Sequence, residues 1–68
     1  MEKINNNLQK YRVWKQLTQL ELSKLLKISV NQIRQIEIDK KYPKYQIRAR
    51  ICKFFNVSQN QMFYYGEG

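Results

Sequence analysis

The chain has 68 residues, which is enough for one small domain with a modest core. Its single cysteine excludes an intramolecular disulfide and a cysteine-rich zinc site, and the lack of histidine removes the usual general base and the commonest metal ligand. A net charge of +8, from 13 Lys and Arg against five Asp and Glu, makes a polyanion the expected partner: nucleic acid first, an anionic membrane surface second.

Helical periodicity runs through the first 65 residues. Few helix-breaking residues interrupt it, since Pro43 is the only proline and both glycines stand near the C-terminus. This pattern predicts a single all-α domain over residues 1–68, a compact bundle of five short helices. The first helix is expected from about Asn5 to Gln16, where Leu8 and Tyr11 share one face and Ile4 lies one turn earlier.

Capping sequences mark three later helix starts. A hydroxyl residue is followed three positions later by Glu or Gln in the pairs Thr18–Glu21, Ser29–Gln32 and Ser58–Gln61. In such a capping box the hydroxyl accepts a hydrogen bond from the third helical amide, and the side chain at that position reaches back to the cap. The predicted helix starts are therefore Gln19, Val30 and Gln59.

The remaining helix is predicted to begin near Pro43, because proline suits the first turn of a helix. Apolar residues recur every fourth position behind it, and Asp39–Tyr42 is then the longest loop. The predicted core consists of Leu8, Leu17, Leu22, Leu25, Leu26, Ile28, Ile33, Ile36, Ile47, Ile51, Phe55 and Val57.

Two of these helices are separated by only three residues. One is expected from Gln19 to Leu26 and the next from Val30 to about Ile38, which leaves residues 27–29 as the turn. Two short helices joined in this way have the layout of a helix-turn-helix unit. Ser23 supplies the small side chain that is needed where one helix crosses closely over the other.

The string "LTQLELSKLLKISVNQIRQIEIDKKYP" resembles the Cro/repressor-type (XRE-like) helix-turn-helix regulators of bacteria and their phages, and "ICKFFNVSQNQMF" fits their last two helices. The resemblance covers roughly residues 7–63 and implies a repressor-like five-helix fold. Lys27 and Asp39 stand where the family often has Gly, and Arg48 where it has Ala or an aliphatic residue. A non-Gly residue in a left-handed conformation costs on the order of 1 kcal/mol.

The outward side of the second helix of this unit carries the predicted base-reading residues. At about 100° per residue, Ile33 and Ile36 fall on the core side, and the opposite side is a contiguous stripe that also includes Ile38. Asn and Gln suit adenine, Arg suits guanine, and a small aliphatic group suits the thymine methyl. The resemblance implies that the positions that contact bases are Val30, Asn31, Arg34 and Gln35.

Other polar residues are expected to hold the DNA backbone or the fold. The predicted phosphate-binding residues are Gln19, Ser29, Lys40, Lys41 and Lys44, near helix starts or after the second helix of the unit. The resemblance also implies a structural ion pair between Arg12 and Glu37. If that pair is buried, loss of one partner would cost roughly 3–5 kcal/mol.

The C-terminal tail, residues 62–68, begins with four large apolar or aromatic residues in succession. A domain of this size cannot bury all of them, and exposed aromatics are typical of interfaces between identical subunits. The dimer interface is predicted to include Phe63, Tyr64 and Tyr65. Phe63 can equally well close the core of the monomer.

These features favour a dimeric, sequence-specific regulator of double-stranded DNA, most simply a repressor on a two-fold operator. A protein-interaction module or antirepressor-like partner that uses the aromatic tail is the alternative. An enzyme, a cofactor and a small-molecule ligand are not expected, because the sequence has no paired carboxylates, nucleophile–base pair or Gly-rich phosphate loop. No apolar run can span a bilayer and residues 1–20 lack a signal-peptide core, so a cytoplasmic, nucleoid-associated protein without membrane contact is expected.

Overall fold

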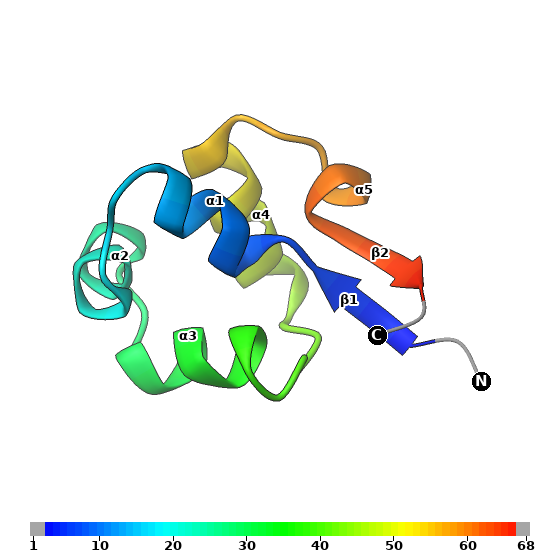
Figure 1. Ribbon diagram of the computed structural model, residues 1–68, viewed down its shortest axis with the longest axis horizontal. Helices are drawn as coiled ribbons and strands as arrows, with labels where there is room; N and C mark the ends of the chain where they lie inside the picture. Colours follow the sequence, from blue (N-terminus) through cyan, green and yellow to red (C-terminus); the bar gives the residue numbers. More distant parts are fainter. Residues whose placement is uncertain (1–2, 67–68) are drawn as a thin grey trace.

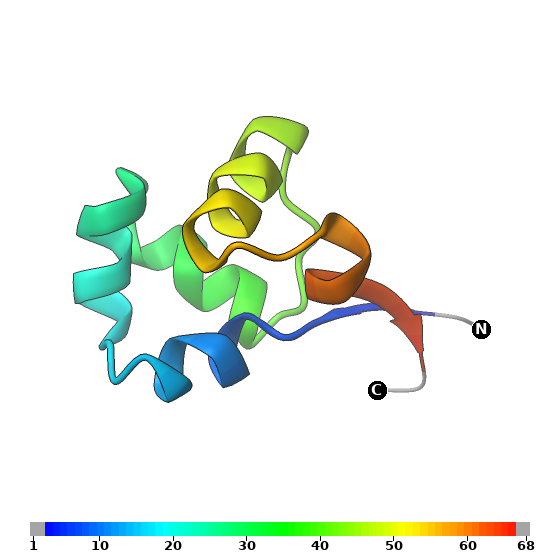
Figure 2. The same cartoon turned by 90° about the horizontal axis from the view of Figure 1, so that it is seen from above.

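The computed structural model describes residues 3–66 and shows five helices arranged around one core, with a small two-stranded sheet at one end (Figure 1). The N- and C-terminal segments run side by side in this sheet, as Figures 1 and 2 both show. The elements are β1 (Lys3–Asn6), α1 (Leu8–Trp14), α2 (Gln19–Leu26), α3 (Val30–Glu37), α4 (Tyr45–Phe55), α5 (Gln59–Met62) and β2 (Phe63–Gly66).

All three predicted capping boxes form, and they set the first residues of α2, α3 and α5. The cap hydroxyls of Thr18, Ser29 and Ser58 accept hydrogen bonds from the third helical amide at 3.0, 3.1 and 3.2 Å. The predicted starts at Gln19, Val30 and Gln59 are therefore confirmed. The bonds that set these starts are local, because each joins residues three positions apart.

The turn between α2 and α3 depends on Lys27, which adopts the left-handed conformation at φ 59°. This conformation lets the Ile28 amide donate to the Ser23 carbonyl at 3.0 Å and closes the C-terminal end of α2. After α3 the left-handed residue is Lys40, at φ 56°, and Asp39 keeps an ordinary backbone. The strain expected at Asp39 thus falls one residue later in the chain.

The all-α expectation is incomplete, because residues 3–6 form β1 and pair antiparallel with β2. Ile4 lies opposite Tyr65, and Asn6 lies opposite Phe63. Asn6 ends the strand and starts α1: its Oδ1 accepts from the Leu8 amide at 3.0 Å, and its Nδ2 donates to the Ile36 carbonyl at 2.9 Å. Since asparagine favours such local bonds over helix interiors, α1 begins at Leu8 instead of Asn5.

Two other helix boundaries differ from the sequence expectation. The first helix ends at Trp14, because Gln16 takes a left-handed conformation at φ 59° and turns the chain toward α2. Pro43 lies before α4 and outside its first turn, since Lys44 is the N-cap and Tyr45 is the first helical residue. The irregular segment between α3 and α4 is therefore residues 38–44, longer than the predicted loop.

The core contains most of the predicted residues, although Leu25 is exposed because it lies on the outer side of α2. Leu17, Ile28, Ile47 and Val57 pack at its edge and are only partly buried. The fully formed core comprises Leu8, Leu22, Leu26, Ile33, Ile36, Ile51, Cys52, Phe55, Met62 and Phe63. Met62 and Phe63, predicted as tail residues, enter it because β2 folds back against β1.

Within residues 3–66, no helix has the length and hydropathy required to cross a membrane. The same part of the chain brings together no group of three or more His, Cys, Asp or Glu side chains that could hold a metal ion.

Candidate nucleic-acid interface

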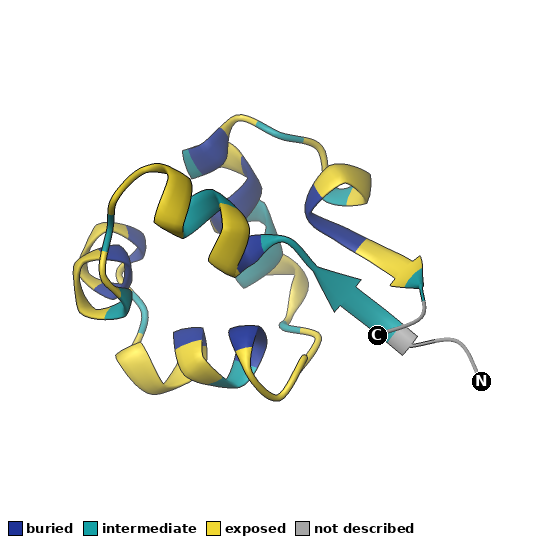
Figure 3. Ribbon diagram, viewed as in Figure 1, coloured by how far each residue is buried: buried dark blue, intermediate teal, exposed yellow. Residues whose placement is uncertain are grey.

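The outward side of α3 is open to solvent, and its inner side is packed against the core. Ile33 and Ile36 are buried, whereas Val30, Asn31 and Arg34 are exposed. In Figure 3, α3 is dark blue where it faces the rest of the molecule and yellow on much of its outer side. The two sides predicted from helical spacing are thus the two sides that the structure shows.

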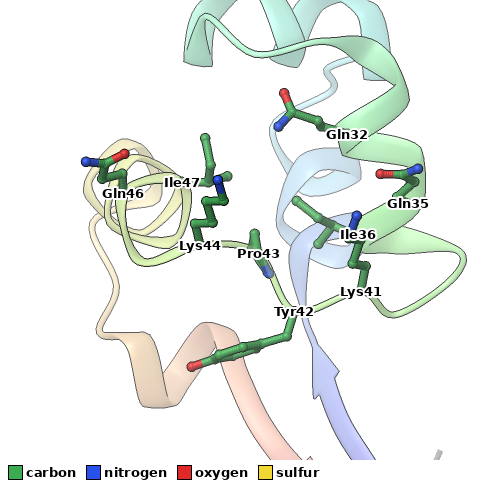
Figure 4. Close-up of a pocket in the computed structure, with 9 residues that line it drawn as sticks. All are labelled: Gln32, Gln35, Ile36, Lys41, Tyr42, Pro43, Lys44, Gln46 and Ile47. Carbon is green, nitrogen blue, oxygen red and sulfur yellow. The ribbon is translucent and has the colours of Figure 1, made fainter.

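Gln35 differs from its neighbours because it is only half exposed. It borders a cleft of about 350 Å³ between α3 and the segment that leads into α4 (Figure 4). Within residues 3–66, the side chains of Asn31, Arg34 and Gln35 make no hydrogen bond to the protein, so their polar groups are free for another molecule. Gln32 is different, since its Oε1 accepts from the Ser29 amide at 3.1 Å and completes the cap of α3.

Lys41 and Lys44 line the same cleft as Gln35, which places positive charge beside the outer side of α3 (Figure 4). The Lys41 amide donates to the Gln35 carbonyl at 3.1 Å, and this bond fixes the loop against the end of α3. Lys40 is exposed one residue earlier. The structure thus brings these three lysines close to the end of α3.

The two other predicted phosphate-binding residues are partly engaged within the protein. Gln19 Nε2 donates to Glu37 Oε1 at 3.1 Å, so this side chain contributes to the fold. Ser29 Oγ accepts from the Gln32 amide at 3.1 Å as the cap of α3. The Ser29 side chain is exposed, but its hydroxyl and its backbone amide both donate to Gln32 Oε1, at 3.4 and 3.1 Å. The backbone amides at the start of α2 still point out of the helix end.

Arg12 and Glu37 form a two-bonded ion pair beneath this surface. Arg12 Nε lies 2.7 Å from Glu37 Oε2, and Arg12 Nη2 lies 3.1 Å from Glu37 Oε1. Arg12 Nη1 also donates to the Leu17 carbonyl at 2.8 Å. Together with Gln19, the pair connects α1, the start of α2 and the end of α3, and it holds α3 in place.

Sequence reasoning missed two residues that support the candidate interface, Asn6 and Arg48, and it missed the bond of Gln19 to Glu37, since Gln19 is predicted only as a phosphate contact. Asn6 holds the C-terminal end of α3 through the Ile36 carbonyl, and Gln19 completes the Arg12–Glu37 network. Arg48 donates to the Pro43 carbonyl at 2.6 Å and to Gln59 Oε1 at 3.2 Å, and its guanidinium lies 4.3 Å from the Tyr42 ring centroid. Of these roles, only that of Arg48 had a signal in the sequence, because Arg stands where the family has Ala or an aliphatic residue.

The predicted dimer residues lie on β2 and differ in exposure. Phe63 is 7% exposed and packs edge-on against Tyr42, with ring centroids 5.7 Å apart, so its side chain belongs to the monomer core. Tyr65 is 69% exposed and Tyr64 is 37% exposed. Residues 67 and 68 of the predicted tail lie outside the described residues.

Cys52 is buried on α4, and burial raises the pKa of its thiol, an effect that Arg48 opposes more weakly. A raised pKa disfavours the thiolate, which is the nucleophilic form of cysteine. Its environment therefore fits a core residue better than a reactive one.

Comparison with curated proteins found no match to this chain. A family model described as a helix-turn-helix domain matches residues 5–68, which is nearly the whole chain. This match agrees with the α2–turn–α3 geometry, in which a short turn centred on Ile28 joins two capped helices. The chain belongs to the helix-turn-helix domain family.

Proposed function

We propose that the protein is a sequence-specific regulator of transcription that binds double-stranded DNA as a homodimer and acts as a Cro/repressor-type repressor. One observation carries this proposal: the outer side of α3 presents unbonded Asn31 and Arg34 side chains, while its inner side and end are held rigidly by the core and by Glu37. Rigid placement of polar side chains on a helix is what reading of base edges in the major groove requires.

Base reading falls to four residues in this proposal. Arg34 donates two hydrogen bonds to guanine, and the carboxamides of Asn31 and Gln35 each pair with adenine. Val30, at the start of α3, meets a thymine methyl group. Gln35 reaches the DNA from the edge of the cleft that it shares with Lys41 and Lys44.

Phosphate contacts flank this surface. Lys40, Lys41 and Lys44 neutralise phosphates on the C-terminal side of α3. Gln19 contributes its backbone amide and the second hydrogen of its side-chain amide. Ser29 contributes its exposed hydroxyl, which exchanges the long 3.4 Å bond to Gln32 Oε1 for a bond to phosphate. The net charge of +8 supplies the general attraction to the duplex.

Selection of bound duplexes from a random pool tests the proposal. Wild-type protein should enrich one sequence, and variants with Asn31→Ala or Gln35→Ala should lose preference at separate base pairs. Lys24→Gln is a matched control, because this exposed lysine lies on the outer side of α2. Selection of the same bases by the Asn31 and Gln35 variants as by wild type would show that α3 is not the reading helix.

The salt dependence of binding provides a second measurement. Each lost phosphate contact lowers the slope of log K against log salt by about one. Lys41→Gln should therefore weaken binding to every duplex alike and reduce the slope, whereas Arg34→Gln should reduce discrimination among duplexes. Equal slopes for Lys41→Gln and wild type would remove Lys41 from the phosphate contacts.

The dimer is proposed to form along β2, whose far edge is not paired with β1 and which presents Tyr64 and Tyr65. Exposed Tyr side chains are suited to interfaces because they bury a large area with one polar end. Phe63 supports this strand from the core side. Tyr65→Lys should shift the protein to monomer in sedimentation equilibrium without unfolding it, and Val13→Lys, at an exposed apolar residue of α1, is the control.

A protein-interaction module is the second candidate, favoured by a cleft of about 280 Å³ beside the tail that is lined by Ile4, Tyr42, Gln59, Asn60, Phe63, Tyr64 and Tyr65. In this case the partner would be another regulator bound through aromatic contacts. Such binding should change little with salt, whereas duplex binding should weaken steeply as salt rises. A titration at two salt concentrations separates the two candidates.

A further inference from the structure

Exposed apolar residues form a second surface, on α1, α2 and the C-terminal end of α4, that the proposed DNA contacts do not use. Trp14 at the end of α1 is 77% exposed, and Leu25 on α2 is 54% exposed. Tyr11 and Phe54 are partly buried between them and the core. We name Tyr11, Trp14, Leu25 and Phe54 the α1–α4 face.

The aromatic members of this face form a row that is joined through Phe55, a buried residue of the core. The ring centroids of Trp14 and Tyr11 are 6.5 Å apart, those of Tyr11 and Phe55 are 5.7 Å apart, and those of Phe55 and Phe54 are 4.9 Å apart. Phe54 and Leu25 then line one open cleft of about 460 Å³. The exposed Trp14 and Leu25 therefore stand at the two ends of a row of packed aromatic rings and are not isolated side chains, which favours an interaction site.

Basic side chains surround the row. Lys15 Nζ lies 5.9 Å from the centre of the Phe54 ring, and Lys10 lines a cleft with Tyr11 and Trp14. The cleft at Phe54 is also lined by Lys27, Arg50 and Lys53.

No acidic side chain of the described residues lines either of these two clefts. Glu21 lies one turn before Leu25 on α2, but its Oε1 accepts from the Thr18 amide at 2.9 Å in the helix cap. The α1–α4 face is therefore apolar with a positive rim.

The charge of the rim selects among possible partners. A second copy of this chain, with net charge +8, would bring two positive rims together and repel. Duplex DNA would match the charge but offers little apolar surface to Trp14 and Leu25. An amphipathic helix with an apolar stripe flanked by Glu and Asp matches both the row and its rim.

We propose that the α1–α4 face binds an acidic amphipathic helix of a partner protein, with Trp14 as the central anchor. Exposed Trp is the residue type that most often dominates binding energy when a partner covers it. In Figure 1, α3 lies at the lower edge of the molecule, the C-terminal end of α4 lies at the upper edge, and α1 lies between them. No residue of α3 lines either cleft of the α1–α4 face, so the partner helix leaves the outer side of the proposed reading helix free.

The single tryptophan of the chain gives a direct test. The probe is a synthetic peptide of about 18 residues, long enough to hold a helix, with Leu and Phe on one face and Glu and Asp around it. Titration of the full chain with this peptide should shift the Trp14 emission to shorter wavelength, because the indole leaves water. Anisotropy of the labelled peptide should give a saturable curve, weakened roughly tenfold or more by Trp14→Gln or Leu25→Gln.

Ile38→Gln is the matched control, because Ile38 is a similarly exposed apolar residue, 64% exposed, next to α3. It should leave peptide affinity unchanged, as should replacement of residues on α3. A peptide with Gln in place of Glu and Asp should bind more weakly. The difference in affinity between the acidic peptide and the Gln peptide should be smaller for the Lys15→Gln variant than for wild type. Circular dichroism melting of each variant checks that the fold is retained.

Three results would overturn the proposal. The first is that the peptide does not bind, or that it binds without a change in Trp14 emission and with the same affinity for the Trp14→Gln variant as for wild type. The second is an emission shift produced by a single-stranded thymidine oligonucleotide and not by the peptide, which would assign the face to single-stranded nucleic acid. The third is a shift that depends on protein concentration alone, which would assign it to a second copy. None of these results depends on whether the protein binds duplex DNA.

Discussion

Arg12 and Glu37, 25 residues apart in the chain, are joined by two hydrogen bonds of 2.7 and 3.1 Å, and the Glu37 side chain is 1% exposed. The pair connects α1 to the last residue of α3, and Gln19 adds a third bond to the same carboxylate. The position of α3 is therefore held by a carboxylate that is almost completely buried. A carboxylate in such a place depends on its partners, since removal of one leaves it buried and unpaired.

Arg12→Ala should lower the free energy of unfolding by roughly 3–5 kcal/mol, which for a domain of this size removes much of its stability. Urea denaturation followed by circular dichroism measures the change. Lys10→Ala is the matched control, because Lys10 lies on the same helix and is exposed. An Arg12→Ala protein that melts with wild-type Tm would show that the ion pair contributes little to the fold.

Lys27→Gly should stabilise the protein by about 1 kcal/mol, because glycine adopts the left-handed conformation without the steric cost that a Cβ adds. The backbone of Lys27, at φ 59°, supports this expectation. The control is Lys24→Gly, one turn earlier within α2, which should destabilise by about 1 kcal/mol. Thermal melts of the two variants should therefore move in opposite directions, and a shift in the same direction would contradict the prediction.

Glu21 should make stability depend on pH in the acid range. Hydrogen bonds from the Thr18 amide and, more weakly, the Thr18 hydroxyl lower the pKa of the Glu21 carboxyl below its usual 4.5. Because the unfolded chain then binds more protons than the folded chain in this range, the ionised Glu21 stabilises the fold. This stabilisation is fully present above pH 4.5 and is lost as the pH falls through the lower pKa of the folded state. Denaturant titrations across this range should show a flatter profile for Glu21→Gln, which keeps the capping box without the ionisation. Identical profiles would argue against the lowered pKa.

Much of the helical structure could be predicted because its signals are local. Thr18, Ser29 and Ser58 each set a helix start through bonds within four residues of chain. The inner and outer sides of α3 follow from the same local geometry, which is why Val30, Asn31 and Arg34 are exposed as expected. Their role in reading bases stays a prediction.

The two strands could not be predicted from spacing, because they come from opposite ends of the chain. Ile4 has the spacing of a helical residue relative to Leu8, yet it pairs across the sheet with Tyr65. The bond of Gln19 to Glu37 could not be predicted for the same reason, since it joins residues that are 18 positions apart in the chain. Leu25 was predicted to be a core residue because it is apolar and lies on α2. In the described chain no element covers that side of the helix, so the side chain is exposed.

Arg48 should stabilise the segment that carries Lys41 and Lys44, because it bonds to Pro43 and stacks between Tyr42 and Tyr45, 4.3 and 5.6 Å from their ring centroids. Arg48→Lys keeps the charge but loses the planar stacking and the paired donors, and it should cost about 1–3 kcal/mol of unfolding free energy. If the protein binds duplex DNA, affinity should fall while the salt slope stays constant, because no phosphate contact is removed. Arg50→Lys, two residues later on α4 with longer bonds of 3.4 Å, is the control. Equal loss of stability in the two variants would show that the tyrosine pair and the Pro43 bond give Arg48 no special role.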